Sequence, residues 1–202
     1  MSILWFQIAT TEFLKASEKE ALILAENLSA LYWNNQDLLI AAHDFLQRGG
    51  KISILHYGEL DKRSDMTAFV KQNGCVCERL STLNWRHSLV IDAQEYPALA
   101  NFIVYDNKRY QYNHFFLSDT ASACANDKYG ITDRLRKWFH HALSQELALR
   151  EKLPTEQLEK LRAESNEILQ ASHKNMGRLI ACHDRGMLVK RQRAYGLERT
   201  NK

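Results

Sequence analysis

The pattern of apolar and polar positions predicts a strand, a helix and a second strand near the N-terminus. Ala21–Ala25 is a continuous apolar run, typical of a central parallel strand covered on both faces, although the same residues also suit a helix. Apolar residues then recur at helical spacing in a segment that Asn34 or Asn35 can cap and that Gly49-Gly50 ends. Ile52–Tyr57 is predicted to be a strand. This order predicts two parallel strands joined by a right-handed crossover helix.

Three shorter elements flank this unit. One helix is expected at Thr11–Glu20, and a second begins at Asp65. A further strand is expected at Cys75–Leu80. Cys75 and Cys77 lie two positions apart, so on a strand they share one face, where free cysteine behaves as a small apolar residue. We therefore expect buried thiols at this pair.

The second half of the chain changes to an antiparallel pattern. Ser88–Ile91 is predicted to be a strand. Phe102–Tyr105 and Arg109–Tyr112 are predicted strands joined by Asp106-Asn107, residue types that tolerate the positive φ of a tight hairpin turn. A helix over residues 132–150 has one strong apolar face, and we expect this face to close the core: Leu135, Trp138, Phe139, Ala142, Leu143 and Leu147.

Pro154 breaks that helix, and Thr155 can cap another that continues to about residue 182. The apolar stripe of this second helix is thin, so the helix either packs back on the preceding one or meets a partner chain. We predict an α/β fold, with a mixed sheet and a parallel βαβ core flanked by helices over residues 1–152. A basic, helical C-terminal extension follows over residues 153–202.

Composition excludes several classes of protein. Of 202 residues, 45% are hydrophobic and 25% charged, which is ordinary for a folded domain. No apolar run approaches the ~18 residues that a membrane span needs, and the apolar N-terminus lacks the basic start of a signal peptide, so we expect a cytoplasmic protein. The four cysteines supply no second close pair beside Cys75 and Cys77, so neither a zinc site nor another metal or cofactor is expected.

Charge is divided unevenly along the chain. From Ser172 onward eight basic residues face only two acidic ones, a net charge of +6, whereas the rest of the chain has 19 basic and 22 acidic residues, a net charge of −3. Clustered cations beside Tyr195, a possible stacking ring, favour contact with the phosphates of DNA or RNA. A basic end can also serve solubility or a protein partner. The candidate nucleic-acid-binding residues are Lys174, Arg178, Arg185, Lys190, Arg191 and Arg193.

The order of elements from Ile23 to Leu143 resembles one half of the phospholipase D-like superfamily. The similar features are the helix ending in Arg48-Gly49-Gly50, the hairpin around Tyr105–Lys108 and the closing helix with Trp138-Phe139. The resemblance implies an enzyme motif, His-x-Lys-x4-Asp, in which the histidine attacks a phosphodiester and the lysine binds the phosphate.

None of the eight histidines is followed two positions later by lysine. At the candidate strand, His87 leads to Leu89, so the resemblance implies a member of the superfamily without catalytic activity. Arg86 and Asp92 near His87 leave open a residual phosphate pocket, although a strand histidine bonded to the backbone explains the same residues. Motifs for phosphate loops, dinucleotides and hydrolase elbows are absent from the sequence.

Three functional hypotheses follow. The first is a non-catalytic α/β module that binds nucleic acid through its basic C-terminal segment. The second is an adaptor or regulatory subunit that docks on a partner protein, or on its own copy as an oligomer, through the 155–182 helix. A third is an enzyme or ligand site at the acidic loop with Glu59, Asp61 and Asp65, because open α/β sheets bind ligands at the carboxyl ends of strands; three acids also describe a solvated turn.

Overall fold

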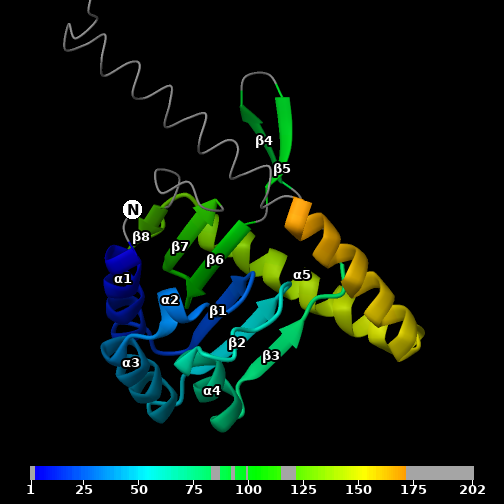
Figure 1. Ribbon diagram of the computed structural model, residues 1–202. Coiled ribbons are helices and arrows are strands. Elements are labelled where there is room, and N and C mark those ends of the chain that lie inside the picture. Colours follow the sequence, from blue (N-terminus) through cyan, green and yellow to red (C-terminus); the bar gives the residue numbers. More distant parts are fainter. Residues whose placement is uncertain (1–2, 83–86, 92–93, 99, 115–121, 172–202) are drawn as a thin grey trace, which may run out of the picture.

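The computed structural model describes residues 3–82, 87–91, 94–98, 100–114 and 122–171 (Figure 1). Six strands form one sheet in the order β3-β2-β1-β6-β7-β8, and β4 and β5 form a separate two-stranded hairpin. The strands are β1 Glu20–Ala25, β2 Lys51–His56, β3 Val76–Arg79, β4 His87–Ile91, β5 Gln94–Ala98, β6 Ala100–Tyr105, β7 Arg109–His114 and β8 Ser122–Cys124. The helices are α1 Ile3–Lys15, α2 Ala30–Trp33, α3 Gln36–Gln47, α4 Asp65–Gln72, α5 Ile131–Lys152 and a further helix over 155–171.

The predicted parallel core is confirmed. β1 pairs in parallel with β2, with Ile23 opposite Ile54, and β2 pairs in parallel with β3, while β6 lies antiparallel to β1. Asn35 caps α3 by accepting the backbone N–H of Leu38. The turn after α3 needs its second glycine, because a Cβ at Gly50 would lie 2.5 Å from the ring of Phe45.

The β6–β7 turn is also as predicted, and it has a second function in the fold. Asp106 has a φ of 50°, the left-handed conformation expected of this turn. Its carboxylate accepts backbone N–H groups from Glu18, Lys19 and Glu20, at 2.9–3.1 Å. The hairpin therefore also fixes the loop that leads into β1.

Helices cover both faces of the sheet (Figure 1). On one face, residues of α1, α2, α3 and α4 pack against the strands, with Phe45, Ile54 and Met66 fully buried. On the other face, α5 packs over β1, β6 and β7, with Phe139 fully buried and the half-buried Trp138 stacked on Phe102. Burial on both faces explains why β1 is apolar throughout Ala21–Ala25.

Some of the local predictions are wrong in detail. The first helix spans Ile3–Lys15 and not Thr11–Glu20, because the chain must turn before Glu20 to enter β1. The start of α5 is held by Asp127, whose carboxylate accepts the N–H and the hydroxyl of Thr132. Leu147 is 46% exposed, and the neighbouring Glu146 takes the inward position.

The 155–171 helix packs back on the α/β unit. Leu158 and Leu169 are buried, and Leu169 belongs to the core cluster under α5. The Ser165 hydroxyl donates to the Ser81 carbonyl at 3.0 Å. Over this range the thin apolar stripe is thus covered within the same chain. The boundary between residues 152 and 153 stays a prediction.

No helix within the described ranges is long and apolar enough to cross a membrane.

Candidate functional site at the carboxyl edge of the sheet

The predicted nucleic-acid-binding residues fall outside the described part of the protein. This applies to all six: Lys174, Arg178, Arg185, Lys190, Arg191 and Arg193. His87 begins β4 and pairs with Ala98, and the neighbouring Arg86 and Asp92 lie outside the described residues. The site that can be built from described side chains lies instead where the parallel strands end, the edge at which open α/β sheets bind ligands.

A cavity of about 210 Å³ opens at the carboxyl end of β1. Its walls come from α1 and α2, from the last residues of β1 and from the first residues of β6, because antiparallel pairing places the start of β6 beside the end of β1. The described residues that line it are Phe6, Ile23, Leu24, Ala25, Glu26, Asn27, Ser29, Leu31, Tyr32, Trp33, Asn101, Phe102, Ile103 and Gln111.

Asn101 holds the polar end of this cavity together. Its side-chain oxygen accepts the Glu26 backbone N–H at 2.9 Å and the Tyr57 hydroxyl at 2.8 Å. The backbone of Gly58 in turn donates to the Glu26 carbonyl at 2.7 Å. A Cβ at Gly58 would lie 3.0 Å from that carbonyl and 3.1 Å from Cγ of Glu26, so glycine permits the close approach of the two loops.

Glu26 places a carboxyl group in the lining of the cavity. Burial, and then the charge of Glu26, raise the pKa of Tyr32 and raise that of Tyr57 well above the usual value. Both phenols therefore stay protonated at neutral pH and act as hydroxyl groups. None of the described lining residues is lysine, arginine or histidine. This lining is unsuited to a phosphate group.

Asn101 also occupies the lysine position of the motif His-x-Lys-x4-Asp when the motif is aligned on Asp106. In the motif His-x-Lys-x4-Asp the lysine precedes the aspartate by five positions, and Asn101 precedes Asp106 by five. The position of the motif's histidine is then Leu99. Scanning forward from histidines could not find this alignment. Scanning back from Asp106 would have found this alignment. Leu99 and Asn101 then stand at the histidine and lysine positions, so the aligned residues include neither a nucleophile nor a cation for a phosphate.

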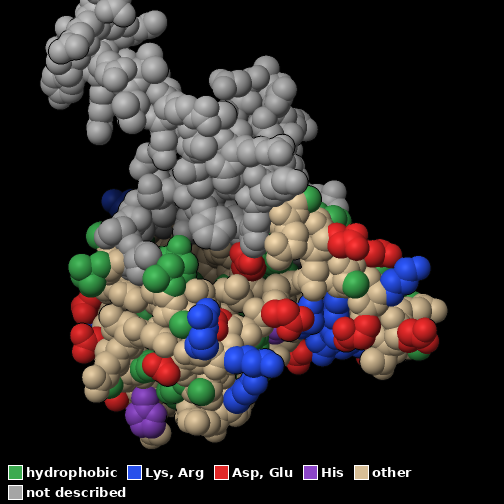
Figure 2. Space-filling view, viewed as in Figure 1, with side chains coloured by type: hydrophobic (Ala, Val, Ile, Leu, Met, Phe, Trp, Pro, Cys, Tyr) green, Lys and Arg blue, Asp and Glu red, His purple; other side chains and the backbone are tan. Residues whose placement is uncertain are grey.

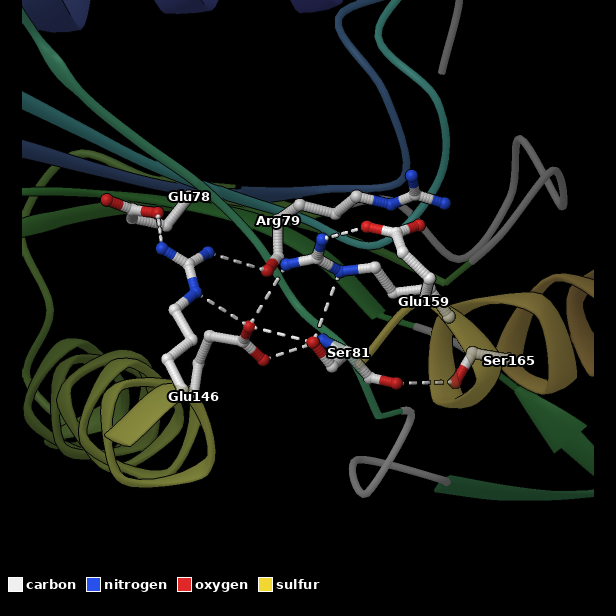
Figure 3. A network of polar contacts seen from close by, with 8 residues as sticks. Glu78, Arg79, Ser81, Glu146, Glu159 and Ser165 are labelled. Atoms are coloured by element: carbon white, nitrogen blue, oxygen red, sulfur yellow. Dashed lines mark hydrogen bonds and ion pairs between the residues drawn. The ribbon is translucent and has the colours of Figure 1, made fainter. Parts of the chain in front are cut away.

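The other half of the carboxyl edge is a network of charged groups centred on Glu146 of α5 (Figure 3). The Glu146 side chain is only 1% exposed, and it accepts the Ser81 N–H at 2.6 Å and the Ser81 hydroxyl at 2.8 Å. Arg150 approaches it at 3.0 Å and Arg162 at 3.4 Å. Arg150 also binds Glu78 and the Arg79 carbonyl. Each charge is satisfied inside the protein, which is the arrangement of a structural clamp.

His56 lies between the cavity and this network, at the end of β2. It is buried, and its Nδ1 lies 2.8 Å from the Gly58 carbonyl, so Nδ1 carries the proton of the neutral ring and donates it. Burial lowers the pKa of His56; Arg79 and Arg162 add to the effect, while the Gly58 carbonyl and Glu59 oppose it. His56 is therefore neutral at pH 7.

The acidic loop is tied into the fold. The Asp61 carboxylate accepts the Ala30 N–H at 3.0 Å and binds Arg63, and these contacts, that with Arg63 first, lower the pKa of Asp61 to about 2. Glu59 pairs with Arg79 at 2.6 Å, and the backbone of Asp65 donates to Asn34. These contacts favour the interpretation of a structural turn over that of a ligand site. Within the described ranges, no group of three potential metal ligands occurs.

No protein-family model matches the sequence, and neither does any curated protein. Among solved structures, the chain is similar to NucT from Helicobacter pylori, at 12% identity over 70% of this chain and 89% of that one, with a TM-score of 0.47. It is similar to Nuc from Salmonella typhimurium, a phospholipase D family member, at 13% identity over 68% and 86%, with a TM-score of 0.42. It is also similar to TrmBL2, an archaeal DNA-binding chromatin protein, at 15% identity over 71% of this chain and 50% of that one, with a TM-score of 0.46. At this level the likeness concerns the arrangement of helices and strands.

Proposed function

We propose that this chain is a non-catalytic α/β module that binds nucleic acid through its basic C-terminal segment. The observation that carries the proposal is the partition of charge, +6 over residues 172–202 against −3 over the rest. A dense cluster of lysine and arginine gains affinity for nucleic acid by releasing the counterions condensed on the phosphates. The α/β unit then supplies a folded body on which the segment is mounted.

The described surface supports the assignment of the phosphate contacts to the C-terminal segment. On the face drawn in Figure 2, acidic and basic side chains are interspersed over the described part of the protein, without an extended basic area. Several described arginines are already paired with carboxylates, as Arg79 is with Glu59 and Arg136 with Glu20. The cavity at the carboxyl end of β1 is lined by Glu26 and by no described lysine, arginine or histidine. Neither this face nor this cavity offers phosphate an extended basic surface, which supports the C-terminal segment as its partner.

The absence of catalysis is part of the same proposal. Neither reading of the motif, forward from His87 or back from Asp106, supplies a histidine together with a lysine. Phosphoryl transfer of this kind needs a nucleophile and a cation on the phosphate in one place. The adaptor hypothesis loses support over residues 155–171, because Leu158 and Leu169 are covered within the chain.

The test is binding of a fluorescent duplex and a single strand, by anisotropy over a salt series, to the full chain and to a chain lacking residues 184–202. The deletion removes Arg185, Lys190, Arg191, Arg193, Arg199 and Lys202. The affinity of the full chain should fall steeply as the salt concentration rises. The log–log slope should have a magnitude of about 3–5, from about 0.9 per phosphate contact. Discrimination between sequences should be weak, since backbone contacts carry no sequence information. Equal binding by both chains at low salt would refute the proposal and leave a protein partner for this segment.

A further inference from the structure

The cavity at the carboxyl end of β1 combines an aromatic wall with a carboxylate. Phe6 lies edge-to-face with Tyr32, at 5.9 Å between ring centroids, and with Trp33, at 6.1 Å. These rings, together with Ile23 and Phe102, make most of the lining apolar. Sites for small molecules have this character, with an apolar body and a few placed polar groups.

The one charged side chain among the described lining residues, Glu26, is a hydrogen-bond acceptor. Glu26 is the only carboxyl group among the described lining residues; burial, and after it the charge of Glu26, raise the pKa of Tyr32, which lines the same cavity. A carboxylate has about four acceptor positions, so a bound donor can add to the contacts that Glu26 already makes. The oxygen of Asn101 is held by Tyr57 and by the Glu26 backbone, which fixes this end of the cavity before any ligand arrives.

We propose that this cavity is a binding site for a small primary amine carried on an apolar or aromatic body. The ammonium group would bind the Glu26 carboxylate and face the neighbouring rings, whose π faces attract cations. The apolar body would lie along Phe6 and Trp33. At about 210 Å³ the cavity is smaller than the roughly 300–1,000 Å³ of sites for drug-sized ligands, so the ligand is correspondingly small.

This site differs from the proposed nucleic-acid contacts in its charge and in the residues that form it. An anionic phosphate is disfavoured beside Glu26, whereas an amine is favoured there. Binding of an amine in the cavity can therefore succeed or fail independently of nucleic-acid binding by the C-terminal segment.

The experiment uses the full chain, labelled with ¹⁵N, and three probes of one shape: benzylamine, benzyl alcohol and benzoate. The indole N–H signal of Trp33, assigned with a Trp33→Phe variant, reports occupancy of the cavity. Benzylamine should shift this signal saturably. Benzyl alcohol should bind about tenfold more weakly, as expected for losing a charge-assisted hydrogen bond, and benzoate more weakly still.

Glu26→Gln should raise the dissociation constant for benzylamine about tenfold while leaving that for benzyl alcohol nearly unchanged. Glu12→Gln, which removes an exposed carboxylate of α1, is the matched control and should change neither. If Glu26→Gln fails to fold, the probe series on the unaltered chain still decides. Benzyl alcohol binding as tightly as benzylamine, or the absence of a saturable shift at Trp33, would overturn the proposal.

Discussion

Replacing Glu146 by alanine should destabilise the protein through the clamp that joins α5, the end of β3 and the 155–171 helix (Figure 3). The change leaves the buried Ser81 N–H without its acceptor at 2.6 Å, and it takes a carboxylate from both Arg150 and Arg162. Breaking a buried charge pair from one side costs about 3–5 kcal/mol. Arg150 keeps Glu78, so we expect about 3 kcal/mol, the lower end of that range.

Urea unfolding, followed by circular dichroism, measures this loss. For a slope of about 2 kcal/mol per molar urea, the midpoint should fall by about 1.5 M. Hydrogen exchange should increase over residues 155–171, because the substitution removes the contact of Arg162 in that helix with Glu146. The matched control is Glu151→Ala, on the exposed side of α5. Its free energy of unfolding should stay within about 0.5 kcal/mol of that of the unaltered chain. Equal stability of the two variants would refute a clamp at Glu146.

Three further predictions concern the core, pH and catalysis. Phe139→Ala should lower the free energy of unfolding by about 3–5 kcal/mol, because the ring is fully buried; a loss under 1 kcal/mol in urea would contradict its place in the core. The lowered pKa of His56 means that the unfolded chain takes up its proton first as pH falls below about 6.5, so His56 destabilises the fold there. His56→Asn keeps a donor for Gly58 but does not titrate, and its stability relative to the unaltered chain should rise between pH 7 and pH 5; a constant difference would contradict the assignment. The chain should hydrolyse no phosphodiester, with or without divalent metal, and turnover that His87→Ala abolishes would disprove the non-catalytic proposal.

The elements that sequence could predict are those with local signals. α3 was predictable because a cap at Asn35, a helical apolar period and the glycines at its end lie within sixteen residues. The β6–β7 hairpin was predictable for the same reason, since Asp106-Asn107 suits its turn. The capping of residues 18–20 by Asp106 was not, because it joins positions almost ninety residues apart.

The candidate site shows the same division. Glu146 sits beside Leu147 on α5, and an apolar stripe drawn from spacing alone assigns the inward position to leucine. The structure gives it to Glu146, because the Ser81 N–H and Arg162 reach it from distant segments and Arg150 reaches it from the next turn of α5. The cavity likewise needs Glu26 and Asn101 together, 75 positions apart. The available signals were an acid directly after a central strand and the spacing back from the hairpin aspartate.

The central claim is that phosphates contact the C-terminal segment. It is tested most directly by removing the same number of positive charges from two different parts of the chain. One full-length variant has Lys190→Gln, Arg191→Gln and Arg193→Gln, and its matched control has Arg134→Gln, Lys137→Gln and Lys152→Gln on exposed positions of α5. Both lose three positive charges, so a difference between them reports position and not net charge. Anisotropy with one labelled oligonucleotide across a salt series should show the log–log slope falling by about 3 for the first variant and by less than about 1 for the second. Equal slopes for the two variants, or a larger decrease in slope for the α5 variant, would contradict the account.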